Sequence, residues 1–277
     1  MGRVDMPLPQ LRPLGGTSRT DAWWVRSVVV GSLLLAFIVY ATWAAFQGKN
    51  YHVAEGGAQY LSPFYSPELW GDSPHALLGK KPGWLPWPGF LAFSPAMLIL
   101  WAPGGFRFTC YYYRGAYYKA LWADPPGCAV GEPGFRQKSY RGEQKFPLIL
   151  QNIHRYFLYA AVAFIGLLAY DAWKAMWFEN PATGQTEFGI GVGTIILTVN
   201  VILLGSYTFG CHAFRHLVGG FKDEVSKSPM CDTAYACSTA LNYKHQLFAW
   251  CSLFSVMFSD VYIRLCSMGI WSDLRLL

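Results

Sequence analysis

Long apolar runs, nearly free of charged residues, alternate with polar connections along this chain. A bilayer core of roughly 30 Å needs about 20 apolar residues in one helix, so each run of that length predicts a membrane span. Five runs qualify, over residues 24–46, 84–103, 153–170, 188–210 and 245–268. We therefore expect an all-α integral membrane protein, with a bundle of five transmembrane helices over residues 24–268, a leader (1–23) and a tail (269–277).

The second run differs from the others because prolines lie in it and beside it. Pro86, Pro88, Pro95 and Pro103 lack the backbone N–H that the interior of a helix requires. Lipid contains no water that could replace the missing hydrogen bonds. A helix over residues 84–103 is therefore expected to be broken or short.

Lysine and arginine residues predict the orientation, because the side of the membrane with the excess normally remains in the cytoplasm. Fifteen of them lie before residue 27 or in the connections 104–151 and 213–244, whereas five lie in the other connections and the tail. The N-terminus is thus expected in the cytoplasm and the C-terminus outside, with a long cytoplasmic connection between spans 2 and 3. The leader lacks the pattern of an organelle-targeting peptide, so we expect a bacterial plasma membrane.

Composition agrees with a membrane protein. Only 14% of the residues are charged and 17% are aromatic, against roughly 25% charged in an ordinary soluble domain. These values exclude a disordered or fibrous chain. The net charge of +6 is not gathered into a Lys/Arg-rich block, so nucleic acid is not an expected partner.

Metal-ligating side chains are concentrated at one level of the predicted bundle. Four histidines and three cysteines lie there: His154, His212, His216, His245, Cys110, Cys128 and Cys211. Such side chains are costly at membrane depth, which favours a functional interpretation. Disulfide bonds are not expected on the reducing cytoplasmic side. Cys251 and Cys266 lie inside the fifth run and are interpreted as small packing residues.

Three kinds of metal centre suit these residues. Haem b takes one histidine from each of two helices, whereas two cysteines and two histidines at one depth suit a Rieske-type [2Fe–2S] cluster or a structural zinc site. His212 and His216 are four residues apart and share a helix face. Cys128 follows Pro126 and Gly127 in a rigid turn whose N–H groups could face a sulfur atom. The residues alone leave these alternatives open.

The long connection also contains many aromatic and basic residues, which either anchor helices at the interface or form a quinone pocket. A quinone needs hydrogen-bond donors to its two carbonyl oxygens in an otherwise apolar cleft. The candidate quinone-binding residues are Tyr113, Arg114, Tyr117, Arg155 and Tyr156. No catalytic residue in the strict sense is expected in this chain.

Four segments together resemble a known family. They are FRFTCYYYRGAYYKALWADPPGCAVGEP from Phe106, FPLILQNIHRYFLY from Phe146, GCHAFRHLVGG from Gly210 and LNYKHQLFAW from Leu241. In this order, each with a Cys or His, they resemble the membrane subunit of the actinobacterial-type succinate dehydrogenase, respiratory complex II. The resemblance covers about residues 85–268 and omits the leader and the connection 47–83.

The resemblance implies a membrane anchor with two partner subunits on the cytoplasmic face, a flavoprotein (FAD) that oxidises succinate and an iron–sulfur subunit. It also implies a site for menaquinone or ubiquinone, and a Rieske-type [2Fe–2S] cluster with two Cys and two His ligands. Haem b remains the alternative cofactor, since other complex II anchors use it. A higher oligomer of the complex is left open. A non-enzymatic scaffold or transporter with a zinc site is the alternative from a different class.

Position along the chain orders the seven candidate ligands. Cys110 and Cys128 share one connection and are the favoured thiolate pair, and His154 and His245 begin two spans and are the favoured imidazole pair. The rivals are Cys211, His212 and His216.

Overall fold

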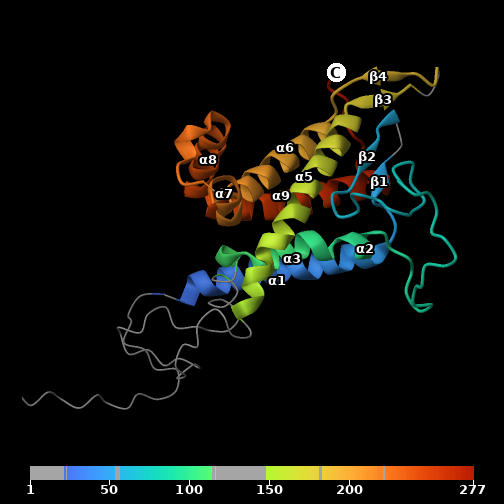
Figure 1. The fold of residues 1–277 in the computed structure, drawn as a ribbon. Helices are drawn as coiled ribbons and strands as arrows, with labels where there is room; N and C mark the ends of the chain where they lie inside the picture. Colours follow the sequence, from blue (N-terminus) through green and yellow to red (C-terminus); the bar gives the residue numbers. More distant parts are fainter. Residues whose placement is uncertain are drawn as a thin grey trace, which may run out of the picture.

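Four long apolar helices dominate the computed structural model, which describes residues 22, 24–53, 57–113, 116, 148–180, 183–220 and 222–277 (Figure 1). Each is long and apolar enough to cross a membrane, and they correspond to the first, third, fourth and fifth predicted spans: α1 (Trp24–Gln47), α5 (His154–Lys174), α6 (Val192–Phe209) and α9 (His245–Ser267). The chain is therefore a multi-pass membrane protein that is mostly helical.

The second predicted span is not a long helix, which corrects the expected range of 84–103. Residues 84–94 are irregular, and the helical part is α2 (Ala96–Ile99) followed by α3 (Trp101–Thr109). Pro103 has no N–H to donate to the carbonyl of Ile99, so the helix is interrupted at Leu100. The two segments together measure about 21 Å, which is less than the roughly 30 Å of a bilayer core.

The helix ends gather at two ends of the molecule. The first, which we call the cysteine–histidine end, contains the start of α1, the end of α3, the starts of α5 and α9, the end of α6, and the short elements η3 (Leu148–Ile153), α7 (His212–Gly219), η4 (Val225–Lys227) and α8 (Pro229–Tyr243). Between the two ends, α6 packs along α9 and α5, α3 packs on α5, and α1 contacts α2 and α9.

The opposite end, which we call the loop end, carries two antiparallel hairpins. Strand β1 (His52–Val53) pairs with β2 (Tyr60–Leu61), and β3 (Trp177–Glu179) pairs with β4 (Thr186–Phe188). The C-terminal residues return to this end, where the Leu276 amide donates to the Ile190 carbonyl. The connection 47–83, to which the sequence assigned no role, thus packs over the bundle, and Tyr60 and Tyr65 within it are fully buried.

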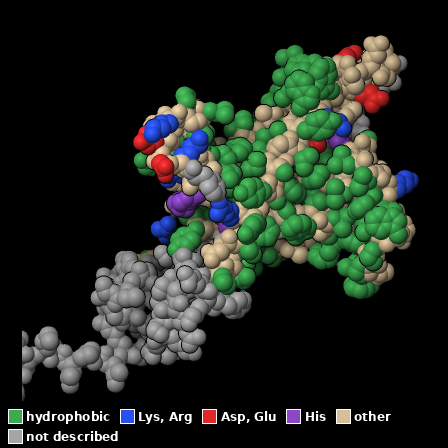
Figure 2. Space-filling view, viewed as in Figure 1, with side chains coloured by type: hydrophobic (Ala, Val, Ile, Leu, Met, Phe, Trp, Pro, Cys, Tyr) green, Lys and Arg blue, Asp and Glu red, His purple; other side chains and the backbone are tan. Residues whose placement is uncertain are grey.

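Apolar side chains cover much of the visible outer surface of the helices (Figure 2). Val28, Leu35 and Val39 on α1 and Ile202 on α6 are each at least half exposed. Basic and histidine side chains gather at the α7–α8 side of the cysteine–histidine end in the same view. This distribution is typical of a bundle whose flanks face lipid and whose ends face water.

Candidate functional site

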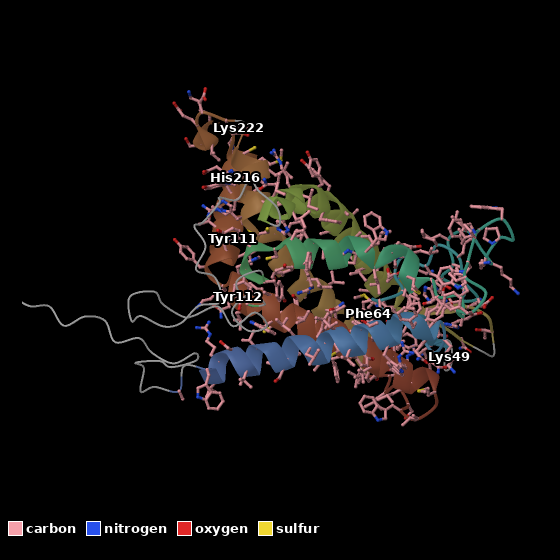
Figure 3. All side chains as sticks on the ribbon, turned by 90° about the horizontal axis from the view of Figure 1, so that it is seen from below. Lys49, Phe64, Tyr111, Tyr112, His216 and Lys222 are labelled. Atoms are coloured by element: carbon pink, nitrogen blue, oxygen red, sulfur yellow. The ribbon has the colours of Figure 1, made fainter. Side chains whose placement is uncertain are left out.

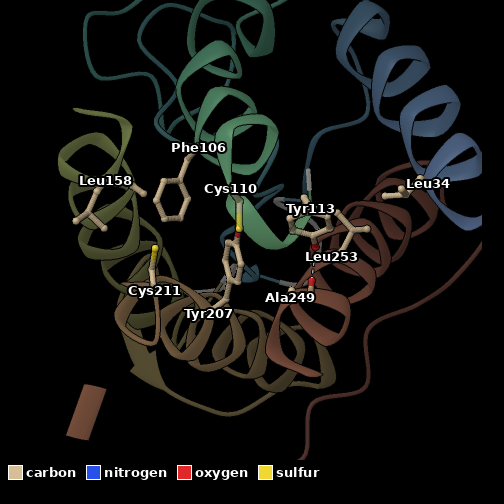
Figure 4. Close-up of a cluster of buried hydrophobic side chains, with 10 residues drawn as sticks. Leu34, Phe106, Cys110, Tyr113, Leu158, Tyr207, Cys211, Ala249 and Leu253 are labelled. Atoms are coloured by element: carbon tan, nitrogen blue, oxygen red, sulfur yellow. Dashed lines mark hydrogen bonds between the residues drawn. The ribbon is translucent and has the colours of Figure 1, made fainter. Parts of the chain in front are cut away.

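Two cysteines and two histidines converge at the cysteine–histidine end. Nε2 of His154 lies 3.1 Å from Sγ of Cys211, and Sγ of Cys110 lies 4.0 Å from Nε2 of His245. The four side chains come from four different parts of the chain, because each histidine is the first residue of a long helix and each cysteine lies between two helical segments. Both thiols are buried, and Figure 4 shows them entering one core cluster together with Phe106 and Tyr207.

The backbone explains why both thiols point inward. Cys110 and Cys211 have extended conformations, with ψ of 129° and 142°, and each breaks the helix that precedes it. The turn before Cys211 is tight at Gly210, where an added Cβ would lie 2.8 Å from the Ser206 carbonyl oxygen and 3.0 Å from Cβ of Leu241. A larger residue at position 210 would therefore displace the thiol.

A hydroxyl group selects the tautomer of His154. Oγ1 of Thr109 donates to the Gly105 carbonyl at 2.7 Å and lies 2.9 Å from Nδ1 of His154. Since the hydroxyl proton is already used, Nδ1 of His154 must be the donor in the second contact. The lone pair of the imidazole is then on Nε2, the atom that faces Cys211.

Aromatic rings hold both imidazoles in place. Phe106 stacks on His154 with ring centroids 4.5 Å apart, and Tyr207 stacks on His245 at 5.0 Å. The Arg107 guanidinium lies 4.7 Å from the centre of the Tyr207 ring. It donates hydrogen bonds to Tyr113 Oη and Ser252 Oγ, which hold it in place. Orientation of this kind is what a metal ligand requires from the residues around it.

The site also contains a buried nitrogen, Nδ1 of His245, that has no hydrogen-bond partner in the described part of the chain. Burial raises the pKa of the Cys211 thiol to about 12, although the backbone N–H groups of Ala213 and Phe214 at the start of α7 lower it and the neighbouring Cys110 raises it. The thiol is thus neutral at pH 7 without a cation. These amides are the feature that the sequence predicted for the turn at Cys128, and the structure has them at Cys211.

A cavity of about 870 Å³ opens beside the four side chains, and all four line it. The other polar residues that line it are Thr109, Asn152, Arg155, His212, His216 and Asn242. Tyr111 and Tyr112 supply an aromatic wall, and Figure 3 shows both on the same end of the molecule as His216. The cavity therefore combines apolar surface with a few hydrogen-bonding groups, as binding sites for small molecules do.

The structure separates the predicted site residues into groups. Cys128, Arg114 and Tyr117 lie outside the described residues. Arg155 lines the cavity, whereas the Tyr113 hydroxyl is buried and donates to the Ala249 carbonyl at 2.5 Å. Tyr156 is 71% exposed and is not part of the cavity wall.

Sequence reasoning missed the residues that orient the donors, namely Thr109, Phe106 and Tyr207. The sequence hinted at two of them only by their nearness to a candidate ligand, since Phe106 lies four residues before Cys110 and Thr109 directly precedes it. Within the described ranges, no three His, Cys, Asp or Glu side chains lie close enough to hold one metal ion. The four donors instead form two Cys–His contacts.

Comparisons with known proteins agree on one family. A family model described as the actinobacterial succinate dehydrogenase subunit SdhC matches residues 25–269. The chain is also similar to a chain in the structure of the Mycobacterium smegmatis Sdh1 complex in the apo form, with 42% sequence identity and a TM-score of 0.81 over 100% of both chains. No curated protein matches the sequence.

Proposed function

The chain belongs to the family of the actinobacterial succinate dehydrogenase subunit SdhC, and from this premise we propose that it binds a Rieske-type [2Fe–2S] cluster beside a quinone site. The family confirms the resemblance found in the sequence and makes the chain a subunit of a succinate dehydrogenase complex, together with other subunits of that enzyme. Succinate oxidation itself is assigned to a partner subunit.

The convergence of Cys110, Cys211, His154 and His245 is the observation that carries the proposal. Two thiols and two imidazoles are the donor set of a Rieske-type centre. In such a centre the two histidines bind one iron and the two cysteines the other. The contacts seen here each join one cysteine to one histidine, so the four side chains would rearrange locally to hold it. When bound, such a cluster exchanges single electrons between the iron–sulfur subunit and a quinone.

The surrounding residues orient the donor atoms before any cluster binds. Thr109 keeps the Nε2 lone pair of His154 available, and the stacked rings prevent both imidazoles from rotating. Amides at the start of α7 favour negative charge on the sulfur of Cys211. The chain therefore offers donors that neighbouring side chains already orient before a cluster binds.

The quinone headgroup is assigned to the cavity. Arg155 and Asn152 can donate hydrogen bonds to its carbonyl oxygens, and Tyr111 and Tyr112 provide aromatic surface for the ring. Tyr113 does not line the cavity, but its hydroxyl accepts a hydrogen bond from Arg107 and so helps to position that side chain. Arg114, Tyr117 and Tyr156 remain candidates from the sequence. Both menaquinone and ubiquinone suit these contacts.

The proposed orientation places the cysteine–histidine end in the cytoplasm. The distribution of Lys and Arg supports it. Segment α2–α3 runs from the loop end to the cysteine–histidine end and would be the fifth crossing element of a bacterial plasma membrane protein. The flavoprotein and iron–sulfur subunits would then dock around α7, α8 and the connection 104–151.

Haem b is the second candidate cofactor, because His154 and His245 lie on two different helices. Optical and EPR spectra of the purified, dithionite-reduced complex distinguish the two, since haem gives a Soret band and a Rieske-type centre a rhombic EPR signal without one. Iron and acid-labile sulfide should fall in the variants Cys110→Ser and Cys211→Ser. An unchanged Rieske signal in both variants would contradict the assignment of these ligands.

A zinc scaffold or transporter is the alternative from a different class. Purified complex that contains stoichiometric zinc and lacks both the rhombic signal and the Soret band would favour it. Quinone reduction by the same preparation would count against it.

A further inference from the structure

The pair His212 and His216 is not used by the proposed cluster. The two residues are four apart on α7, and their Nε2 atoms lie 3.0 Å from each other. Their ring planes are nearly perpendicular, with centroids 4.5 Å apart. Both side chains are exposed, and both line the cavity beside the cysteines and histidines described above.

Two imidazole nitrogens that face each other have two arrangements available. One nitrogen carries a proton and donates it to the other, or both lone pairs point at one cation. A tetrahedral zinc ion bound at about 2.0–2.1 Å holds two nitrogens roughly 3.3 Å apart. The observed separation is within a few tenths of an ångström of that value, and a His pair four apart on one helix face is a known zinc-binding arrangement.

The charges around the pair also fit. Arg215 is the nearest basic residue in the sequence, but its Nη2 donates to Tyr235 Oη at 2.8 Å and its guanidinium stacks on that ring. In the part of the chain that is described, no third His, Cys, Asp or Glu completes the pair. With two ligands from the described residues, the ion would complete its coordination with water and would exchange readily.

We propose that His212 and His216 form an exchangeable site for a divalent transition-metal ion, and that an ion bound there obstructs the cavity and inhibits quinone reduction. The inhibitory part rests on the proposed quinone site. Metal binding by the pair does not depend on it.

Equilibrium dialysis of the intact, detergent-solubilised complex against Zn²⁺, followed by atomic emission, tests the site directly. Wild type should bind zinc saturably, and His212→Ala and His216→Ala should each lower the affinity at least about tenfold. The control His52→Ala, at the loop end, should bind as wild type does. Absence of saturable zinc binding by wild type, or wild-type affinity in either α7 variant, would overturn the site.

Inhibition is measured on the same preparations. Zinc should reduce quinone reduction in wild type, EDTA should reverse the effect, and the iron content should stay constant. The α7 variants should require at least about tenfold more zinc, while reduction of a soluble acceptor stays unaffected. Zinc binding that depends on both histidines but leaves quinone reduction unchanged would overturn the obstruction and indicate a quinone site elsewhere, while the metal site itself would stand.

Discussion

The two ends of the helix bundle each contain a buried polar cluster, and the clusters differ in how their polar atoms are paired. At the loop end, the carboxylate of Asp260 accepts hydrogen bonds from Tyr40 Oη at 2.6 Å, Ser62 Oγ at 2.5 Å and the Arg264 guanidinium at 3.3 Å. Arg264 also donates to the Lys49 carbonyl at 2.9 Å. This cluster joins α1, the connection 47–83 and α9.

At the cysteine–histidine end, soft donors replace the charged groups. One Cys–His contact is 4.0 Å long, and Nδ1 of His245 has no hydrogen-bond partner among the described residues. A buried network whose members are all paired stabilises structure, whereas an incompletely paired one is costly unless something else satisfies it. The comparison therefore indicates a structural role for the Asp260 cluster and supports the binding role proposed for the other.

The largest expected effect is on electron transfer. Cys211→Ala should abolish quinone reduction, with a loss of at least about 100-fold. It removes a proposed ligand, which is at least as severe as the loss of a residue that only orients a ligand. Reduction of a soluble acceptor by the partner subunits should continue. Cys251→Ala, which removes another thiol of α9, is the matched control and should behave as wild type. Normal quinone reduction by Cys211→Ala would rule out its role.

Disruption of the loop-end cluster should affect stability instead. Asp260→Ala leaves the Arg264 guanidinium, 4% exposed, without its carboxylate, and we expect a loss of about 3–5 kcal/mol. Thermal unfolding of the solubilised complex measures it, while the KM for quinone should stay constant. Glu187→Ala breaks the half-exposed pair with Arg275 (3.7 Å) and should cost no more than about 1 kcal/mol. Equal effects of the two changes would contradict the structural role of the Asp260 cluster.

A third prediction concerns pH at the loop end. Burial, together with the smaller effects of the charges of Lys174 and His52, lowers the pKa of His75 from 6.5 to about 4. The unfolded chain thus binds a proton at His75 more readily than the folded chain does. The folded state is therefore not penalised at His75 above pH 6.5, and it loses stability relative to the unfolded state as the pH falls from 6.5 towards 4. The loss approaches about 3 kcal/mol.

The matched variant for this prediction is His75→Phe, because neither ring nitrogen of His75 has a hydrogen-bond partner within the described ranges that the change would remove. Its unfolding temperature, measured from pH 7 to pH 4, should fall less steeply than that of wild type. Parallel curves would show that His75 is not the responsible group.

The smallest predicted change sharpens the contrast at the cysteine–histidine end. Thr109→Val removes the acceptor for Nδ1–H of His154 and should lower quinone reduction about tenfold, with a shift in the EPR signal of the cluster. Thr109→Ser keeps the hydroxyl and should restore both. A Val variant with wild-type spectrum and rate would show that the tautomer is fixed by other contacts.

The sequence predicted the elements that depend on local pattern. Four of the five apolar runs are long helices, and the prolines correctly indicated a weak second run, although the helical part begins at Ala96 rather than near Trp84. Apolar length cannot locate such a boundary, because Trp, Leu and Phe in residues 84–94 are equally apolar inside a helix and outside one.

The candidate site was only partly predictable for a related reason. Depth in the membrane identified the seven Cys and His candidates, but the choice among them depends on turns such as the one at Gly210, which aims Cys211 inward. His154 and His245 were favoured because they begin helices, and the structure places both beside a thiol. The buried pair Asp260–Arg264 was not anticipated, because its partners Tyr40 and Ser62 are more than 190 residues away in the sequence.

The spacing of the four converging donors has a consequence for biogenesis. Cys110, His154, Cys211 and His245 begin or follow separate helical segments, and the last belongs to the final helix of the chain. A nascent polypeptide released into the bilayer before α9 has inserted presents three donors and an open flank. The proposed centre could therefore acquire all four ligands only after α9 has inserted, so its presence would report that the four donor-bearing segments have reached their places.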